Sequence, residues 1–232
     1  MNSENNEYSQ IHKEKQYDFC QEVKNSHGVT KLGLMSNQSW FSDPKRLTFL
    51  FSRYKFVAKM LSNCESAVEI GCADAFASRI VRQEVKELLI TDFDPIFIED
   101  VDSRMDGTWD MKSKVHDILK NPVADGTFDA AYSMDVIEHI QPSDEDTFLS
   151  NIARSVNKHG IVIIGTPSLE SQAYASEISK AGHVNCKSAP EWNALFRKHF
   201  DNVFSFGMND EVLHTGYHKM CQYLLFVCTS KK

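Results

Sequence analysis

A glycine at the end of an apolar run is the first feature of this sequence that could do chemistry. Residues 67–70 predict a short β-strand, Gly71 ends it, and residues 74–86 predict a helix. The small side chains at this turn let the backbone approach a ligand closely. The free N–H groups of the helix start would face that ligand. The turn is therefore a candidate nucleotide-type site, although α/β proteins also use such turns for structure alone.

Acidic residues follow the next two predicted strands. The strand at 88–91 ends in Asp92, which follows Gly71 by 21 positions, and Asp94 is the neighbouring candidate. A carboxylate about 20 positions after a glycine turn binds ribose hydroxyls in dinucleotide-binding folds. Asp117 follows a weaker third strand and could accept a hydrogen bond from an adenine amine. These acids extend the candidate site along one edge of a sheet.

The elements that must position these residues alternate between strands and helices. Further strands are predicted at 128–133, 161–165, 202–206 and 223–227, and helices at 45–61, 144–157 and 190–199. This alternation predicts an α/β fold with a Rossmann-like, doubly wound, mostly parallel sheet. About seven strands are expected. The last two lack a helix between them, which predicts an antiparallel strand near the C-terminus.

Composition narrows the class of protein further. The 232 residues carry a net charge of −7, and an acidic surface disfavours nucleic acid as a partner. No apolar run approaches the roughly 20 residues of a membrane span, and the polar start has no signal-peptide segment. The six cysteines form no C-x-x-C pair. We therefore expect a soluble, cytoplasmic protein with neither nucleic acid nor membrane as partner, and a homodimer stays open.

The chain divides into two predicted regions. Residues 1–42 are polar with few apolar anchors, which predicts an arm or lid, with a short helix around residues 17–19. Residues 43–232 would form one domain. Its first helix begins at Asp43 and Pro44, a pair that suits a helix start.

Four segments, taken in order and spacing, resemble class I S-adenosylmethionine-dependent methyltransferases. They are E-x-G-C-x-D at 69–74, T-D-F-D-P at 91–95, the acid after the third strand, and F-D-A-A-Y-S-M-D-V-I-E-H-I at 128–140. One departure concerns the first motif, which usually reads G-x-G-x-G but here has alanine at 73 and 75. Alanine disfavours positive φ, yet it is the smallest alternative to glycine. The departure also argues against an NAD enzyme, whose pyrophosphate needs the second glycine.

The resemblance implies S-adenosylmethionine as cofactor and assigns residues to its parts. The methionine moiety would contact Glu69, Gly71 and Ala73, and Arg53 would bind its carboxylate. The ribose would contact Asp92 or Asp94, and the adenine would contact Asp117 or Ile118. Ser133 and Met134 would line the side of the site that faces the cofactor sulfur. Arg53 has an alternative role as an ordinary surface arginine.

Methyl transfer to a hydroxyl also needs a general base. His139 follows the fourth strand at the ligand-binding edge, and its imidazole titrates near neutrality, as a base should. Asp135 in the same turn and His183 in a later loop are the other catalytic candidates. Asp135, Glu138, His139 and His183 could converge, but their spacing is not a ligand signature, so no metal is predicted.

The predicted acceptor is small and polar. The loops after the fifth strand and between the last two strands are rich in hydrogen-bonding groups, and the candidate substrate-binding residues are Ser168, Gln172, Tyr174, Asn185, His214 and Tyr217. The stretch G-T-P-S-L-E-S-Q followed by G-H-V-N resembles methyltransferases of bacterial surface-polysaccharide clusters. A sugar or sugar-nucleotide hydroxyl is therefore expected. The alternatives are N-methylation of a small amine, a non-catalytic cofactor-binding module, and RNA methylation, which would require a basic face.

Overall fold

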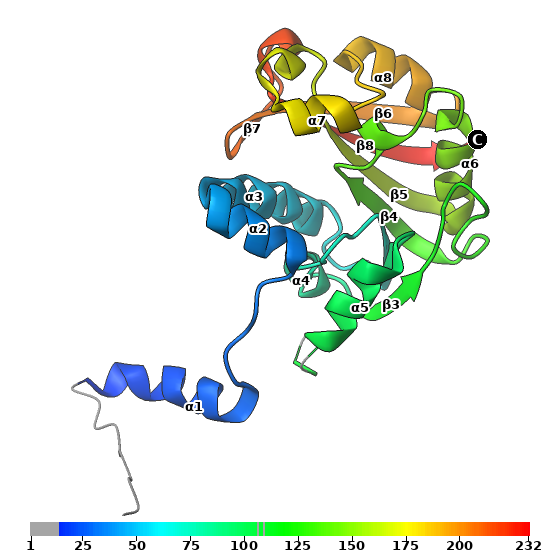
Figure 1. The fold of residues 1–232 in the computed structure, drawn as a ribbon. Coiled ribbons are helices and arrows are strands. Elements are labelled where there is room, and N and C mark those ends of the chain that lie inside the picture. Colours follow the sequence, from blue (N-terminus) through cyan, green and yellow to red (C-terminus); the bar gives the residue numbers. More distant parts are fainter. Residues whose placement is uncertain (1–13, 106, 109) are drawn as a thin grey trace, which may run out of the picture. The chain divides into compact units, whose positions relative to one another are not determined.

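The computed structural model describes residues 14–105, 107–108 and 110–232, in two compact units that divide at Lys31 and Leu32 (Figure 1). In the first unit, the described part holds a 3₁₀ turn, Lys15–Tyr17, followed by the helix α1, Asp18–His27. No residue of α1 is buried. The short helix expected around residues 17–19 lies here, whereas the first 13 residues of the expected arm fall outside the described residues.

The second unit is built on one eight-stranded sheet in the order β3-β2-β1-β4-β5-β8-β6-β7. The strands are β1 Ser66–Ile70, β2 Glu87–Asp92, β3 Lys112–Val115, β4 Phe128–Met134, β5 Val156–Pro167, β6 Phe200–Asn209, β7 Val212–His214 and β8 Tyr223–Lys231. The pairs from β3 to β5 are parallel, and β8 pairs antiparallel with both β5 and β6. This confirms the expected fold class, with β7 as an additional strand.

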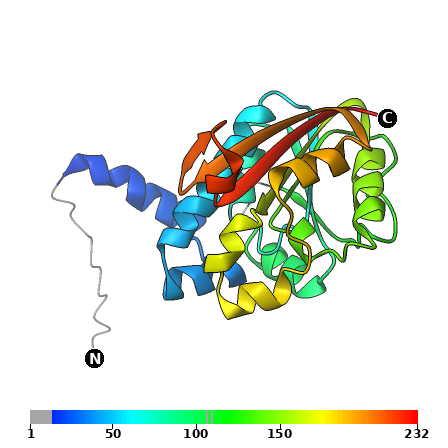
Figure 2. The ribbon, with the colours of Figure 1, turned by 90° about the horizontal axis from the view of Figure 1, so that it is seen from above.

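Helices cover both faces of the sheet. They are α2 Leu34–Ser42, α3 Lys45–Met60, α4 Ser78–Arg82, α5 Pro95–Ser103, α6 Glu145–Ser155, α7 Glu177–Gly182 and α8 Ala189–Phe196. The helices α3 and α6 lie on opposite sides of the strands, and β6 and β8 run side by side in both views (Figures 1 and 2).

The period of two along each strand divides the core into two hydrophobic clusters. Ala67 packs toward α3 and α4, whereas its neighbour Val68 packs toward α6 and α8. In β4 the same alternation places Tyr132 in the first cluster and Ala131 in the second. Strands buried on both faces explain the near-continuous apolar runs of the sequence.

Two elements differ from the sequence-based expectation. The helix expected over 74–86 is confined to α4, because residues 71–77 form an extended turn instead. The helix α2 was expected to belong to the arm, but it is part of the second unit, which begins at Leu32. Within the described ranges, none of the helices has the length and apolar character that crossing a bilayer requires.

Candidate active site

The turn between β1 and α4 is held in a tight, left-handed backbone. Gly71 has φ +74°, and a Cβ there would lie 2.4 Å from Cγ2 of Val136, so this position needs glycine. Ala73 and Ala75 also take positive φ, at 45° and 49°. Alanine disfavours this conformation. The surrounding structure imposes it despite a cost of roughly 1 kcal/mol per residue.

A pocket of about 290 Å³ opens beside this turn. Its walls come from α2, α3, the turn itself and the end of β4. The lining residues are Met35, Ser36, Ser39, Arg46, Leu50, Arg53, Tyr54, residues 71–77, Met134, Asp135 and His139. The pocket lies at the carboxyl ends of β1 and β4, where the strand order reverses direction. Open α/β sheets bind ligands at such a point.

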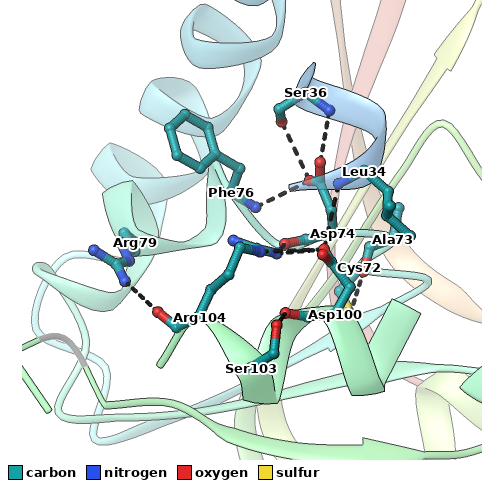
Figure 3. A network of polar contacts seen from close by, with 10 residues as sticks. All are labelled: Leu34, Ser36, Cys72, Ala73, Asp74, Phe76, Arg79, Asp100, Ser103 and Arg104. Atoms are coloured by element: carbon teal, nitrogen blue, oxygen red, sulfur yellow. Dashed lines mark hydrogen bonds and ion pairs between the residues drawn. The ribbon is translucent and has the colours of Figure 1, made fainter. Parts of the chain in front are cut away.

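Carboxylates from elsewhere in the chain fix the start of α2, and Figure 3 shows these contacts. The residue before the helix, Gly33, has no side chain to cap it. The backbone N–H of Ser36 donates to Asp74 Oδ2 at 2.6 Å, and that of Leu34 donates to Asp100 Oδ2 at 3.3 Å. Arg104 links the two acids, because it pairs with Asp100 at 2.8 Å and donates to the carbonyl oxygen of Asp74. Negative groups at a helix N-terminus stabilise it, so α2 is anchored against the turn.

Glu69, expected near the cofactor amine, is fully buried beneath the pocket. Its carboxylate accepts hydrogen bonds from Tyr54 at 2.6 Å, Ser78 at 2.5 Å and Tyr132 at 2.8 Å. Burial raises the pKa of Glu69 to about 7, although the three hydroxyl donors act in the opposite direction. The side chain joins β1 to α3, α4 and β4, and its oxygens are already occupied.

Asp92 stands at the carboxyl end of β2 and holds the turn from the other side. Its Oδ2 accepts from the Ala73 N–H at 2.9 Å, and its Oδ1 accepts from the Asp94 N–H at 3.0 Å. Burial raises its pKa. Asp94 itself caps α5, because its Oδ1 accepts from the Ile96 N–H at 3.1 Å. Neither acid is part of the pocket lining, so their role at a ribose stays a prediction.

The adenine candidates continue along the same edge of the sheet. The N–H of His116 donates to the carbonyl oxygen of Asp92 at 2.8 Å, which brings the loop after β3 to the end of β2. In that loop Asp117 accepts from the Leu119 N–H at 3.0 Å. Ile118 is buried, and its carbonyl accepts from Asn151. The structure therefore places this loop in line with Gly71 and Asp92, as the strand order requires.

Arg53 has a different partner from the expected cofactor carboxylate. Its guanidinium pairs with Asp135 at 2.8 Å and lies 3.7 Å above the ring centre of Tyr223. Both Arg53 and Asp135 line the pocket. The ion pair thus supplies one positive and one negative group to the pocket wall, and Asp135 is oriented by it.

The two residues expected on the sulfur side face different ways. Ser133 is buried, and its hydroxyl donates to the carbonyl oxygen of Ile70 at 2.9 Å, which ties β4 to β1. Met134 lines the pocket. Only Met134 is therefore placed to contact a molecule in that space.

Two histidines and a glutamate meet at the rim of the pocket. The rings of His139 and His183 lie 5.1 Å apart in an edge-on arrangement. Glu138 is buried beside them, and burial together with the nearby Asp135 raises its pKa to about 8. Burial and the neighbouring His139 ring lower the pKa of His183, which favours the neutral imidazole. The structure brings the three catalytic candidates together. Asp135 and His139 line one pocket, and the ring of His183 lies against that of His139.

The predicted substrate-binding residues are not gathered at one surface. Ser168 and Asn185 are buried and bonded to other parts of the chain, through Cys221 O and Glu145 respectively. Oε1 of Gln172 lies 2.7 Å from Nδ1 of His183, within hydrogen-bond distance, so Gln172 lies beside the histidine pair. The other three lie outside the pocket lining: Tyr174 and Tyr217 are exposed, and His214 bonds to Asn209. Binding roles for these six residues remain predictions.

Sequence reasoning missed the contribution of α2. Met35, Ser36 and Ser39 line the pocket, yet they lie in the segment interpreted as a polar arm. The acid that holds this helix, Asp74, is the last residue of the E-x-G-C-x-D motif, but the motif gave it no role toward α2. No local signal marks either side of this contact, because it joins residues 38 positions apart.

A scan of protein families matches residues 68–164 to the model described as a methyltransferase domain. No curated protein matches the sequence. The matched residues run from β1 to β5 and therefore include the turn, Asp92 and the histidine at the pocket rim.

Solved structures share the fold at low sequence identity. An S-adenosylmethionine-dependent methyltransferase from Thermotoga maritima, described as a possible histamine N-methyltransferase, has a TM-score of 0.66 and 18% identity, and the match covers 85% of this chain and 96% of that one. The N-methyltransferase NodS from Bradyrhizobium japonicum, solved with S-adenosylhomocysteine, has a TM-score of 0.62, 15% identity, and coverage of 90% and 97%. A TehB-like methyltransferase from Corynebacterium glutamicum has a TM-score of 0.60, 16% identity, and coverage of 78% and 88%. At these identities the likeness is one of fold.

Residues 68–164 thus match a methyltransferase domain, a class of enzyme that uses S-adenosylmethionine as methyl donor, and the sheet has the Rossmann-like fold of the compared methyltransferases. The chemistry of the pocket fits that cofactor. The turn has the small residues and positive φ values of its binding motif, and the pocket wall carries arginine side chains suited to a carboxylate.

Proposed function

We propose that this protein transfers a methyl group from S-adenosylmethionine to a hydroxyl of a small polar acceptor, a sugar or sugar-nucleotide of surface-polysaccharide biosynthesis. One observation carries the proposal: the motif turn after β1 and the imidazole of His139 line the same pocket. A methyl donor held at the turn and a proton acceptor at the rim would thus share one cavity.

The cofactor supplies an activated methyl group on a sulfonium, and the residues of this chain position it. The turn at 71–75 and Met134 would hold the methionine portion, with Arg46 or Arg53 toward its carboxylate. Asp92 and the loop after β3 would receive the ribose and adenine along the sheet edge. Since the leaving group is already good, positioning would supply much of the rate.

The acceptor side is proposed from the histidine pair. A hydroxyl loses its proton when it is methylated, and a neutral imidazole can take that proton. His183 has a lowered pKa, and its ring lies against His139. The polar side chains around the pair, including Gln172, suit a hydroxylated molecule. The resemblance of the G-T-P-S-L-E-S-Q stretch to polysaccharide-cluster methyltransferases favours a sugar.

The first test measures cofactor binding by calorimetry with S-adenosylhomocysteine. The unaltered protein should bind with micromolar affinity or better, and Asp92→Asn should weaken binding at least about tenfold, or about 1.4 kcal/mol. Asp125→Asn is the matched control, because this exposed acid precedes β4 at the opposite sheet edge. No heat from the unaltered protein, or equal affinities for both variants, would overturn the cofactor site.

A second test separates the acceptor classes. The protein would be incubated with S-adenosylmethionine and separate pools of sugar-nucleotides and small amines, and S-adenosylhomocysteine would be quantified by mass spectrometry. Turnover with sugar-nucleotides, lost in His139→Gln, supports the proposal. Turnover with amines alone would replace it with N-methylation, a class in which two of the compared structures are named. Binding of the cofactor without any turnover would favour a non-catalytic module.

A further inference from the structure

The three side chains Glu138, His139 and His183 could do more than move a proton. Each offers one ligand atom, and these atoms all lie within 4.8 Å of one another. We propose that they form a binding site for a divalent transition-metal ion at the rim of the pocket. Ion binding is independent of the proposed function, whereas the ion's role toward the acceptor rests on it.

Both imidazoles are already oriented as metal ligands are. Nδ1 of His139 lies 2.9 Å from the carbonyl oxygen of Gly182, and Nδ1 of His183 lies 2.7 Å from Oε1 of Gln172. A carbonyl oxygen can only accept, so each Nδ1 carries the proton and each Nε2 keeps its lone pair. Metal-ligating histidines nearly always use this arrangement, in which the second ring nitrogen donates to a carbonyl or carboxylate.

The glutamate provides the second, independent observation. Glu138 is 1% exposed, and its Oε2 accepts from Thr166 at 3.1 Å. Its Oε1 is buried and has no hydrogen-bond partner in the part of the chain that the structure describes. An unsatisfied buried carboxylate oxygen is costly. A bound cation would satisfy it.

The charged side chains described around the cluster do not already supply a cation to Glu138. Asp135, an acid of the same turn, is paired with Arg53 on α3, so that positive charge is directed at Asp135. The backbone around Glu138 is fixed from the other side, because the Asn185 N–H donates to the Glu138 carbonyl at 3.0 Å. A tetrahedral Zn²⁺ holds its ligand atoms roughly 3.3 Å apart. Small side-chain rotations that move the ligand atoms by about an ångström would therefore bring them to the spacing that the ion needs.

The donor set selects the kind of ion. Two imidazole nitrogens and one carboxylate suit Zn²⁺, Mn²⁺, Fe²⁺ or Co²⁺, whereas Mg²⁺ and Ca²⁺ prefer oxygen ligands. Three protein ligands leave at least one coordination position open, as at catalytic metal sites. Because His139 lines the pocket, that position would be available to an acceptor hydroxyl, whose O–H bond the ion would polarise. The metal and the general-base role use the same Nε2 lone pairs and so exclude each other.

The experiment is a titration of the full, chelator-treated chain with Co²⁺, followed by visible absorption spectroscopy, and with Zn²⁺ and Mn²⁺ by calorimetry. We expect binding to saturate at about one ion per chain, and we expect bound Co²⁺ to show d–d bands typical of nitrogen and oxygen ligands. His183→Ala and Glu138→Gln should each weaken binding by about tenfold to a hundredfold, and Gln172→Ala by about tenfold through loss of the ring's orientation. His159→Ala, at an exposed histidine in β5, should leave binding unchanged.

Circular dichroism and metal-free thermal unfolding show which variants are folded, and a variant that unfolds is replaced by His139→Asn. The inference is overturned by absence of stoichiometric binding, by equal affinity in the folded variants, or by near-ultraviolet bands of thiolate ligation. Its failure is distinguishable from that of the proposed function, because S-adenosylhomocysteine binding is measured without metal.

Discussion

At the scale of single residues, the most telling contacts are those of the buried acid Glu69. Its carboxyl group is surrounded by the hydroxyls of Tyr54, Ser78 and Tyr132, which come from α3, α4 and β4. The motif glutamate therefore shapes the pocket floor by joining the elements beneath it. A buried carboxylate that receives only neutral donors keeps a desolvation penalty, which explains a pKa of about 7.

This raised pKa makes stability depend on pH. Between the unfolded value of about 4.3 and the folded value of about 7, the native state binds more protons than the unfolded state. The contribution of Glu69 to the free energy of unfolding is thus fully present below about pH 4.3 and is lost as pH rises through about 7. Glu69→Gln mimics the protonated acid and removes this loss. As pH rises from about 5 to about 8, the variant should gain stability relative to the unaltered protein by on the order of 3 kcal/mol.

Urea unfolding at several pH values measures this difference. Glu99→Gln, at an exposed glutamate of α5, shows the effect of removing one surface charge. A difference between Glu69→Gln and the unaltered protein that stays constant with pH would mean that the buried acid is ionised throughout.

At the scale of elements, the turn between β1 and α4 stores backbone strain. Ala73 has φ 45°, a conformation that costs an L-residue roughly 1–2 kcal/mol and costs glycine nothing. Ala73→Gly should therefore raise the free energy of unfolding by about 1 kcal/mol. Ala77→Gly is the matched control in the same turn, because Ala77 is buried and has an ordinary φ of −81°. This control should lower the free energy of unfolding by about 1 kcal/mol.

Chemical denaturation of the two variants tests the signs. If both substitutions destabilise the protein equally, then Ala73 is not strained, and the alanines fit the turn as well as glycine does.

The same scale shows what could be predicted from sequence and what could not. The apolar runs of β1, β2, β4 and β5 gave their positions to within a few residues, except that β5 begins five residues earlier, at Val156. These strands are buried on both faces, so local composition decides them. Helix α4 was expected to be longer, because helical residue types at 74–77 do not reveal that the backbone is held in a turn by Asp92. Helix α2 lacks a local cap, and its docking depends on two distant acids.

At the scale of the whole molecule, the sequence predicted that the candidate residues share one edge of the sheet, and the structure places them along that edge. The carboxyl ends of β1, β2 and β4 lie together because these neighbouring strands are parallel, as alternating strands and helices predict. Side-chain partners were less predictable. Arg53 meets Asp135, 82 positions away, and such pairs depend on packing in three dimensions. Motifs thus predicted which residues share a sheet edge better than they predicted which side chains contact one another.

The division of the chain at Lys31 and Leu32 leads to a test with two shortened chains. Among the described residues, those before Leu32 supply no member of either hydrophobic cluster and no part of the pocket lining. A chain that starts at Leu32 should therefore keep its free energy of unfolding within about 0.5 kcal/mol and its affinity for S-adenosylhomocysteine. A chain that starts at Asp43 also loses α2, which leaves the buried carboxylate of Asp74 without the N–H of Ser36.

This second chain should lose about 1–3 kcal/mol of stability, because the lost partner bonds to a buried charge. Its affinity should fall by about tenfold, since α2 forms one wall of the pocket. Urea unfolding and calorimetry of both shortened chains check these values. Equal behaviour of the two would place α2 with the arm, as the expected arm of residues 1–42 implies. Loss of affinity on removal of residues 1–31 alone would instead give that segment a part in binding the cofactor.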